Sequence, residues 1–265
     1  MVSSLNRTLA AALILTAKYA LADSSGELRK FKDQDFEVTV NEFVVGAPGK
    51  NVLVIPPTGG TNVIDKSYAK ALAKKGFRVF ILESWTDHDE YNIELSIHTR
   101  FYARAQRAIE TVVKHIPEDQ PIGILGTSVG GIHAAIAAGR IPRITRAMVI
   151  TGGADIASVI TDSDQLAMVD VKKKRMDRYK FRDRDAYLTE LRKVIELEPL
   201  RLGPGYQGKK LGMVISREDT TVPGKNQELL LDLWKPEHVL ELKNNHFWAI
   251  VRTWLFNSDF VVDFF

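Results

Sequence analysis

A serine, an acidic residue and a histidine occur along the chain in an order that suits nucleophilic catalysis. Ser128 lies in GTSVG at 126–130, Glu218 and Asp219 lie in SREDTTVP, and His246 lies in LKNNHFW. A serine hydroxyl becomes a good nucleophile when a histidine takes its proton and an acid orients that histidine. The order therefore favours Ser128 as nucleophile, a histidine near the C-terminus as base, and one of the two acids as its partner.

The serine segment has the pattern G-x-S-x-G, which is typical of a sharp turn from a strand into a helix. The apolar run PIGILG predicts the strand, and VGGIHAAIAAG predicts the helix. Such a turn strains the serine backbone, with φ above zero, and brings the flanking residues against neighbouring backbone. We therefore expect a Cβ to clash at Gly126 and Gly130, and the serine hydroxyl to project from the edge of a sheet.

Other interpretations of this segment remain open. Ser128 could serve only as a helix N-cap, a position that serine favours. A nucleotide-binding loop fits poorly, because the dinucleotide fingerprint needs a glycine where Ser128 stands and the Gly-Lys-Ser/Thr ending of a P-loop is missing.

The position of each histidine in the chain indicates which one could act as the base. Of the six histidines, His238 and His246 alone follow the candidate acids. His238 opens a predicted strand, whereas His246 follows that strand, where active sites of parallel sheets lie. We therefore assign the base to His246.

Strand-like and helix-like segments alternate through most of the chain. Apolar β-branched runs predict strands, and helical spacing predicts the helices between them. This alternation predicts an α/β fold with a mainly parallel sheet covered by helices on both faces. Residues 155–200 are too long for a plain crossover and predict two helices, at 163–181 and 183–197. We interpret these residues as an insertion that could act as a lid, within a single domain (23–265).

The expected strands are 36–45, 51–57, 77–84, 121–126, 146–153, 210–216 and 238–242, and the expected helices are 65–76, 96–115, 129–139 and a terminal helix from 246.

Composition limits the classes of function. The chain has 265 residues, a net charge of +3 and interleaved acids and bases, so we expect no nucleic-acid partner. The run KKKR at 172–175 is interpreted as a solvated helix face. The absence of cysteine excludes disulfides and thiolate metal sites.

The first 22 residues have the order of a secretory signal peptide, with Arg7, a short apolar stretch and ALA before Asp23. The stretch is far shorter than the about 20 residues that span a bilayer, so we expect no stable membrane insertion after cleavage. The expected location is then periplasmic or secreted. If the segment is instead an amphipathic first helix of the domain, the location is cytoplasmic.

From about Asn51 to the C-terminus the sequence resembles the α/β-hydrolase superfamily, with GTSVGG, SREDTTVP and NNHFW in the expected order. The family acid is often followed by Val-Pro, here Val222 and Pro223, so the resemblance selects Asp219 rather than Glu218. The compact size and the ending HVLELKNNH resemble the dienelactone-hydrolase and small serine esterase branch.

The resemblance also implies an oxyanion hole of two backbone N–H groups. Val129, directly after the serine, supplies the first. The second comes from the early loop IPPTGGT at 55–61, where many relatives have His-Gly in place of Pro56-Pro57. Proline has no N–H, so we assign the second donor to Thr58. The alternative is a plain glycine-rich turn.

These residues predict a hydrolase of a carboxylic ester or related acyl compound, acting on a small molecule without a cofactor or metal. Trp85, His88 and Trp248 are expected to contact the substrate. The combination of Ser128, His246 and Asp219 also supports a secreted peptidase or a thioesterase, and a binding protein that kept the fold without catalysis is a further alternative. The oligomeric state stays open.

Overall fold

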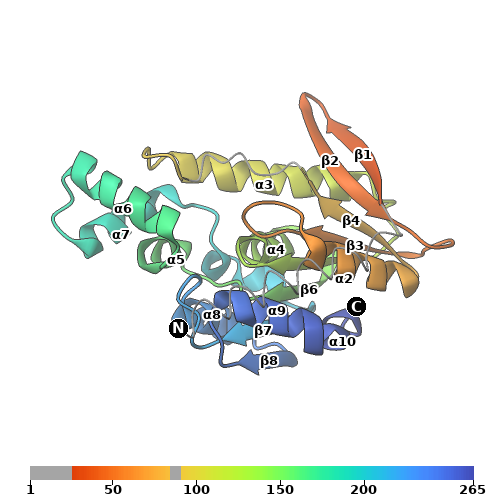
Figure 1. Ribbon diagram of the computed structural model, residues 1–265. Helices are drawn as coiled ribbons and strands as arrows, with labels where there is room; N and C mark the ends of the chain where they lie inside the picture. The colour runs from red at the N-terminus through yellow and green to blue at the C-terminus, as the bar shows by residue number, and fades with distance from the viewer. Residues whose placement is uncertain (1–25, 84–90) are drawn as a thin grey trace.

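One twisted sheet forms the centre of the computed structural model, which describes residues 26–83 and 91–265 (Figure 1). In these residues the sheet has eight strands in the order β1-β2-β4-β3-β5-β6-β7-β8. Neighbouring strands from β4 to β8 are parallel, whereas β2 is antiparallel to both β1 and β4. The predicted mainly parallel α/β fold is thus confirmed. The strands are β1 (Glu27–Asp33), β2 (Phe36–Phe43), β3 (Lys50–Ile55), β4 (Phe77–Leu82), β5 (Ile122–Thr127), β6 (Ile144–Ile150), β7 (Lys210–Ser216) and β8 (His238–Leu242).

Strand β3 illustrates how both faces of the sheet are covered. Leu53 and Ile55 belong to the cluster on one face, whereas Val52 and Val54 belong to the cluster on the other. Successive side chains of a strand point to opposite faces, so a continuous apolar run is what a doubly covered strand requires.

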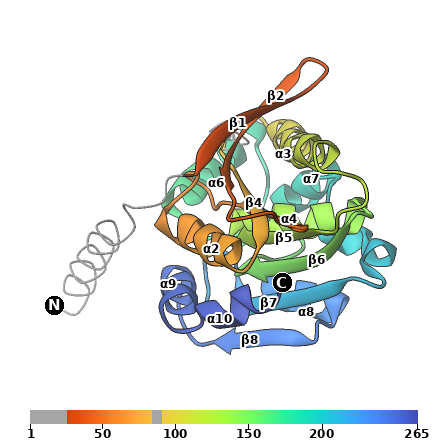
Figure 2. The same cartoon turned by 90° about the vertical axis from the view of Figure 1, so that its right-hand side faces the viewer.

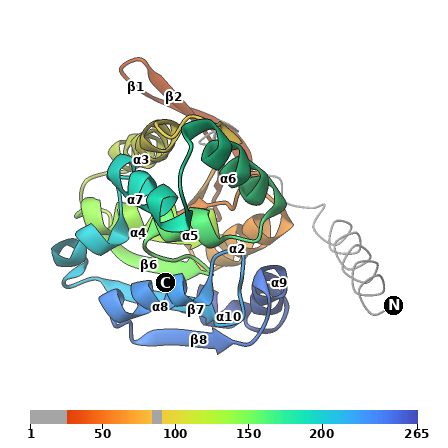
Figure 3. The same ribbon diagram turned by 90° about the vertical axis from the view of Figure 1, so that its left-hand side faces the viewer.

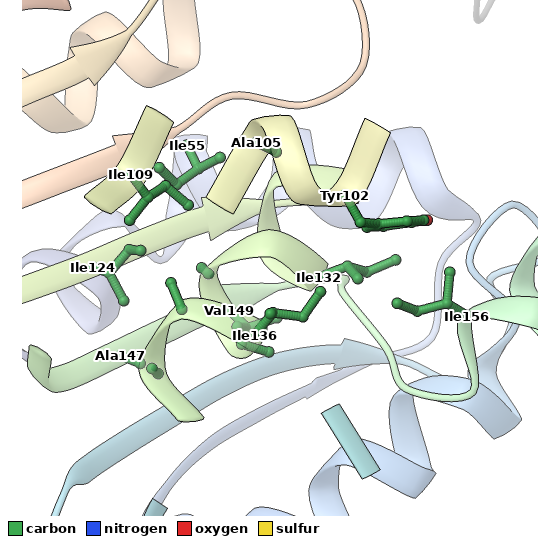
Figure 4. Packing of buried hydrophobic residues seen from close by; sticks show 14 of the residues in the cluster. Ile55, Tyr102, Ala105, Ile109, Ile124, Ile132, Ile136, Ala147, Val149 and Ile156 are labelled. Atoms are coloured by element: carbon green, nitrogen blue, oxygen red, sulfur yellow. The ribbon is translucent and has the colours of Figure 1, made fainter. Parts of the chain in front are cut away.

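Helices form a layer on each face (Figures 1 and 2). The first layer contains α3 (Ile97–Lys114), α4 (Val129–Arg140) and α8 (Gly224–Trp234), and the second contains α2 (Val63–Lys74), α9 (His246–Phe256) and α10 (Ser258–Val262). Figure 4 shows Ile109 of α3 and Ile132 of α4 in one cluster with Ile55 and Ile124 of the sheet.

The insertion between β6 and β7 has more structure than predicted (Figure 3). The expected helices correspond to α6 (Leu166–Tyr179) and α7 (Arg184–Val194), but α5 (Ile156–Asp162) precedes them, and the turns η2 (Pro199–Arg201) and η3 (Gly203–Tyr206) follow. The carboxylate of Glu198 accepts hydrogen bonds from the amides of Asp155 and Ile156, both at 2.8 Å. The end of the insertion therefore holds its beginning.

The expectation of a solvated face for residues 172–175 is wrong for Arg175. Its side chain is fully buried, and its guanidinium donates to the carbonyls of Asn92 and Ile93, to Nε2 of His98 and to the hydroxyl of Tyr187. No carboxylate among the described residues pairs with it. Arg175 therefore attaches α6 to α3 and to the segment that precedes α3.

Three predictions concern residues outside the described ranges, namely the signal peptide at 1–22 and the substrate contacts Trp85 and His88. Among the helices that the structure describes, none is both long and apolar enough to span a membrane.

Replacing Arg175 tests how the insertion is held. Arg175→Ala removes the hydrogen bonds to the buried His98 and Tyr187 and leaves a cavity, so we expect the free energy of unfolding to fall by about 3 kcal/mol. Lys173→Ala, in the same run but exposed, should change it by less than about 0.5 kcal/mol. Urea unfolding of both variants measures the difference. Equal, small effects would contradict the anchoring role of Arg175.

Candidate active site

Ser128 occupies the turn from β5 into α4 in a strained backbone conformation. Its φ is 57° and its ψ is −124°. The positive φ confirms the prediction from the sequence. The amide of Ser128 donates to the carbonyl of Ile150 at 2.8 Å, and its carbonyl accepts from the amide of Gly131 at 2.9 Å. Such a conformation costs about 1–3 kcal/mol and persists because the surrounding structure fixes it.

The two glycines around Ser128 allow close backbone contacts. A Cβ at Gly126 would lie 2.2 Å from the carbonyl oxygen of Gly130. A Cβ at Gly130 would lie 2.2 Å from the carbonyl oxygen of Ile55 and 2.3 Å from that of Pro56. The expected clash is confirmed at both positions. It also shows that the serine turn packs directly on the end of β3, where the loop with Thr58 begins.

The structure brings Ser128, His246 and Asp219 into one hydrogen-bonded chain. Nε2 of His246 lies 2.8 Å from Oγ of Ser128, and Nδ1 lies 2.6 Å from Oδ2 of Asp219. Nδ1 faces a carboxylate, so it carries the proton, and Nε2 is left to accept the serine hydroxyl. The three residues follow the C-terminal ends of the parallel strands β5, β7 and β8.

The carboxylate of Asp219 is buried but fully hydrogen-bonded, with 3% of the residue exposed. Oδ1 accepts from the amides of Thr221 and Val222 at 2.9 and 3.0 Å, and Oδ2 also accepts from Nε2 of Gln227 at 2.8 Å. These donors fix the orientation of the carboxyl group. Glu218, the alternative acid, is exposed.

Gln227 is a site residue that the sequence analysis missed. It lies on α8, and its Oε1 accepts from the amide of Ser216 at 2.9 Å while its Nε2 reaches Asp219. The hydroxyl of Ser216, at the end of β7, bonds in turn to the backbone of Asn244, two residues before His246. Polar side chains thus connect the acid loop with the histidine loop.

Thr58 and Val129 both line the small cavity at Ser128, as an oxyanion hole would require. Thr58 lies in a turn closed by the amide of Gly60 on the carbonyl of Pro57, 3.1 Å apart, with φ of 97° at Gly59. A type II turn needs such a positive φ at its third residue. Among the described residues, neither the amide of Thr58 nor that of Val129 has an acceptor.

The cavity at Ser128 has a volume of about 50 Å³ and a largely apolar wall. Helix α3 contributes Phe101 and Tyr102, and the insertion contributes Val159 and Met168. These wall residues were not recognised in the sequence, because they come from segments without a motif. Trp248 lies instead in the first turn of α9, where its ring meets Phe247, and it is not among the described residues that line the cavity.

His98 adds a polar group to the cavity wall. Nε2 of His98 lies 2.8 Å from the guanidinium of Arg175 and must accept, so the neutral ring carries its proton on Nδ1. Burial and the charge of Arg175 lower the pKa of His98 to about 3. The ring is therefore an uncharged hydrogen-bond donor at neutral pH. In the part of the chain that the structure describes, no cluster of three or more acidic or histidine side chains is placed to hold a metal ion.

Alanine substitution tests the close contact of the serine turn. Gly130→Ala places a methyl group against two carbonyl oxygens of the β3 end, so we expect a loss of about 1–3 kcal/mol in the free energy of unfolding. Gly49→Ala meets no atom within 4 Å and should be neutral. Thermal and urea unfolding compare the two variants. An unchanged Gly130→Ala protein would refute the contact.

Comparison with family models finds no match, and comparison with curated protein sequences finds none at significance either. Solved structures do match. Acylaminoacyl peptidase from Pyrococcus horikoshii superposes with a TM-score of 0.64 at 15% identity, over 92% of this chain and 42% of the peptidase. The chain thus spans less than half the length of that enzyme.

Two other solved structures match this chain over nearly the full length of both chains. Esterase Pf2001 from Pyrococcus furiosus has a TM-score of 0.61 at 13% identity, over 93% of both chains. The thioesterase domain from the curacin biosynthetic pathway has a TM-score of 0.57 at 11% identity, over 91% of this chain and 98% of the domain. Together with the parallel sheet and the serine turn, these matches show that the chain has the α/β-hydrolase fold.

Proposed function

We propose that the protein is a serine hydrolase that cleaves a carboxylic ester or a related acyl compound with a small acyl group. The observation that carries the proposal is the hydrogen-bonded chain from Asp219 through His246 to Oγ of Ser128. Helix capping alone does not require this arrangement. The side chain of Ser128 also makes no capping hydrogen bond to α4.

In the proposed reaction, Oγ of Ser128 attacks the acyl carbon while Nε2 of His246 takes the hydroxyl proton. The imidazolium that forms is stabilised by the buried carboxylate of Asp219, which keeps Nδ1 protonated. His246 then gives its proton to the leaving oxygen, and the acyl group remains on the serine. Water attacks this acyl-enzyme with His246 again as base, which releases the acid.

The amides of Thr58 and Val129 are the proposed donors to the oxyanion. Val129 lies in the first turn of α4, where unpaired N–H groups and the helix dipole favour negative charge. Both residues line the cavity at Ser128. Loss of one such donor typically lowers turnover by about 10²–10³-fold.

The neighbours support acyl transfer as a reaction class and leave the leaving group open, since they are a peptidase, an esterase and a thioesterase. These reactions share the attack on an acyl carbon and differ in the atom that departs. Peptide and thioester substrates are therefore the alternatives within the same mechanism.

Fluorophosphonate labelling tests the nucleophile without assuming a substrate. We expect wild type to be labelled and Ser128→Ala to be unlabelled, because the probe needs an activated serine oxygen. Asp219→Asn should label far more slowly, since the histidine loses its orienting acid. Circular dichroism controls for folding. Well-folded wild type that resists labelling would favour the binding-protein alternative.

The small cavity predicts a preference for short acyl chains. We expect p-nitrophenyl acetate to be hydrolysed with a higher kcat/KM than the octanoate, because the cavity of about 50 Å³ is small and Met168 forms part of its wall. Met168→Ala should raise kcat/KM for the octanoate by about tenfold relative to the acetate. Leu166→Ala, two residues away and exposed, is the matched control. The same chain-length profile in both variants would exclude this wall as the determinant.

A further inference from the structure

The linker between α5 and α6 makes a dense set of contacts with the loop that carries the candidate catalytic acid. The amide of Asp164 donates to the carbonyl of Thr220 at 3.0 Å. Its carboxylate accepts from the hydroxyl of Thr220 at 2.5 Å and from the hydroxyl of Thr221 at 2.7 Å. One residue of the insertion thus binds two consecutive residues of the acid loop.

The bound threonines directly follow Asp219. The amide of Thr221 is one of the donors that hold Oδ1 of Asp219, at 2.9 Å. Thr221 therefore links the two acids: its hydroxyl donates to Asp164, and its amide donates to Asp219. The outcome is a continuous path from Asp164 through Thr221 and Asp219 to His246.

The contacts of Asp164 also favour its carboxylate form. Burial tends to raise the pKa of the Asp164 carboxyl, but the hydroxyls of Thr220 and Thr221 outweigh it, and the pKa lies below its usual value. Asp164 is therefore an ionised acceptor for both hydroxyls at neutral pH.

The other acids near this loop are placed differently. Asp219 is bonded to the ring of His246, and Glu218 is exposed. Asp162, the last residue of α5, is paired with Arg184 and Lys225. Asp164 is exposed as well, but each oxygen of its carboxylate accepts a hydroxyl of the acid loop.

We propose that Asp164 is a positioning residue of the active site, which holds the acid loop through Thr220 and Thr221 and so fixes the orientation of Asp219. This proposal rests on the proposed hydrolase function. It assigns the insertion a part in catalysis in addition to its part in the cavity wall.

The test is the split between kcat and KM for a soluble acetate ester. Asp164→Asn replaces the ionised acceptor by an amide and weakens the hold on Thr220 and Thr221, so kcat should fall by about tenfold because Asp219 is less well oriented. KM should change by less than about twofold, since Asp164 is not among the described residues that line the cavity at Ser128. Asp164→Glu keeps both acceptor oxygens and should recover part of the lost kcat.

Two further variants complete the design. Thr220→Val with Thr221→Val removes the hydroxyl contacts but keeps the carboxylate, so kcat should fall about as much as in Asp164→Asn. Asp170→Asn makes the same charge change at an exposed position that pairs with Lys174, and should leave kcat and KM unchanged.

A wild-type kcat for Asp164→Asn, or an equal fall of kcat in Asp170→Asn, would overturn the proposal. If Asp164→Asn does not fold, a full wild-type rate in the double threonine variant would overturn it instead. Wild type that neither takes up fluorophosphonate nor hydrolyses any ester would refute the hydrolase function itself, which separates the two failures.

Discussion

The strained backbone at Ser128 depends on close backbone contacts that leave no space for a side chain at positions 126 and 130. The turn is held by the carbonyl of Ile150 on one strand and lies against the carbonyls of Ile55 and Pro56 on another. Glycine at positions 126 and 130 permits this approach. The same approach sets the serine hydroxyl beside the loop of Thr58, so the nucleophile and both proposed oxyanion donors are fixed by a single packing constraint.

A buried carboxylate is the second demanding feature, since an ionised group away from water must be hydrogen-bonded. Asp219 meets this demand with two backbone amides, one amide side chain and one imidazole. Gln227 is itself fixed by the amide of Ser216, and the hydroxyl of Ser216 bonds to the backbone before His246. The acid and the base are therefore positioned by the end of the same strand, β7.

Local patterns were sufficient to predict the parts of the molecule that local patterns control. Buried parallel strands are continuous apolar runs, and the serine turn needs its glycines within two residues, so both can be recognised in the sequence. Strand β1 was missed because its residues, ELRKFKD, are charged and mostly exposed at the sheet edge. Gln227 was missed because an isolated glutamine has no signature until the fold brings it to Asp219.

The wrong prediction of a solvated face at Arg175 has the same cause, because its contacts form only when distant segments fold together. Within KKKR, Lys173 and Lys174 are exposed, and the composition of the run indicates contact with solvent. The partners His98 and Asn92 lie 77 and 83 residues before Arg175 in the chain, and only the packing of α6 on α3 brings them together. Composition cannot tell a charged side chain that faces water from one that is buried and hydrogen-bonded.

This distinction changes the interpretation of the insertion. The length of the insertion predicts a possible lid, but several of its charged side chains bind other parts of the protein: Arg175 bonds to α3, Glu198 holds the start of α5, and Asp164 binds the acid loop. Opening such a segment would separate the buried guanidinium of Arg175 from its acceptors and release the turn that orients Asp219. We therefore interpret the insertion as a fixed wall, and the proposal of a small acyl group rests on side chains such as Met168 and not on a gate.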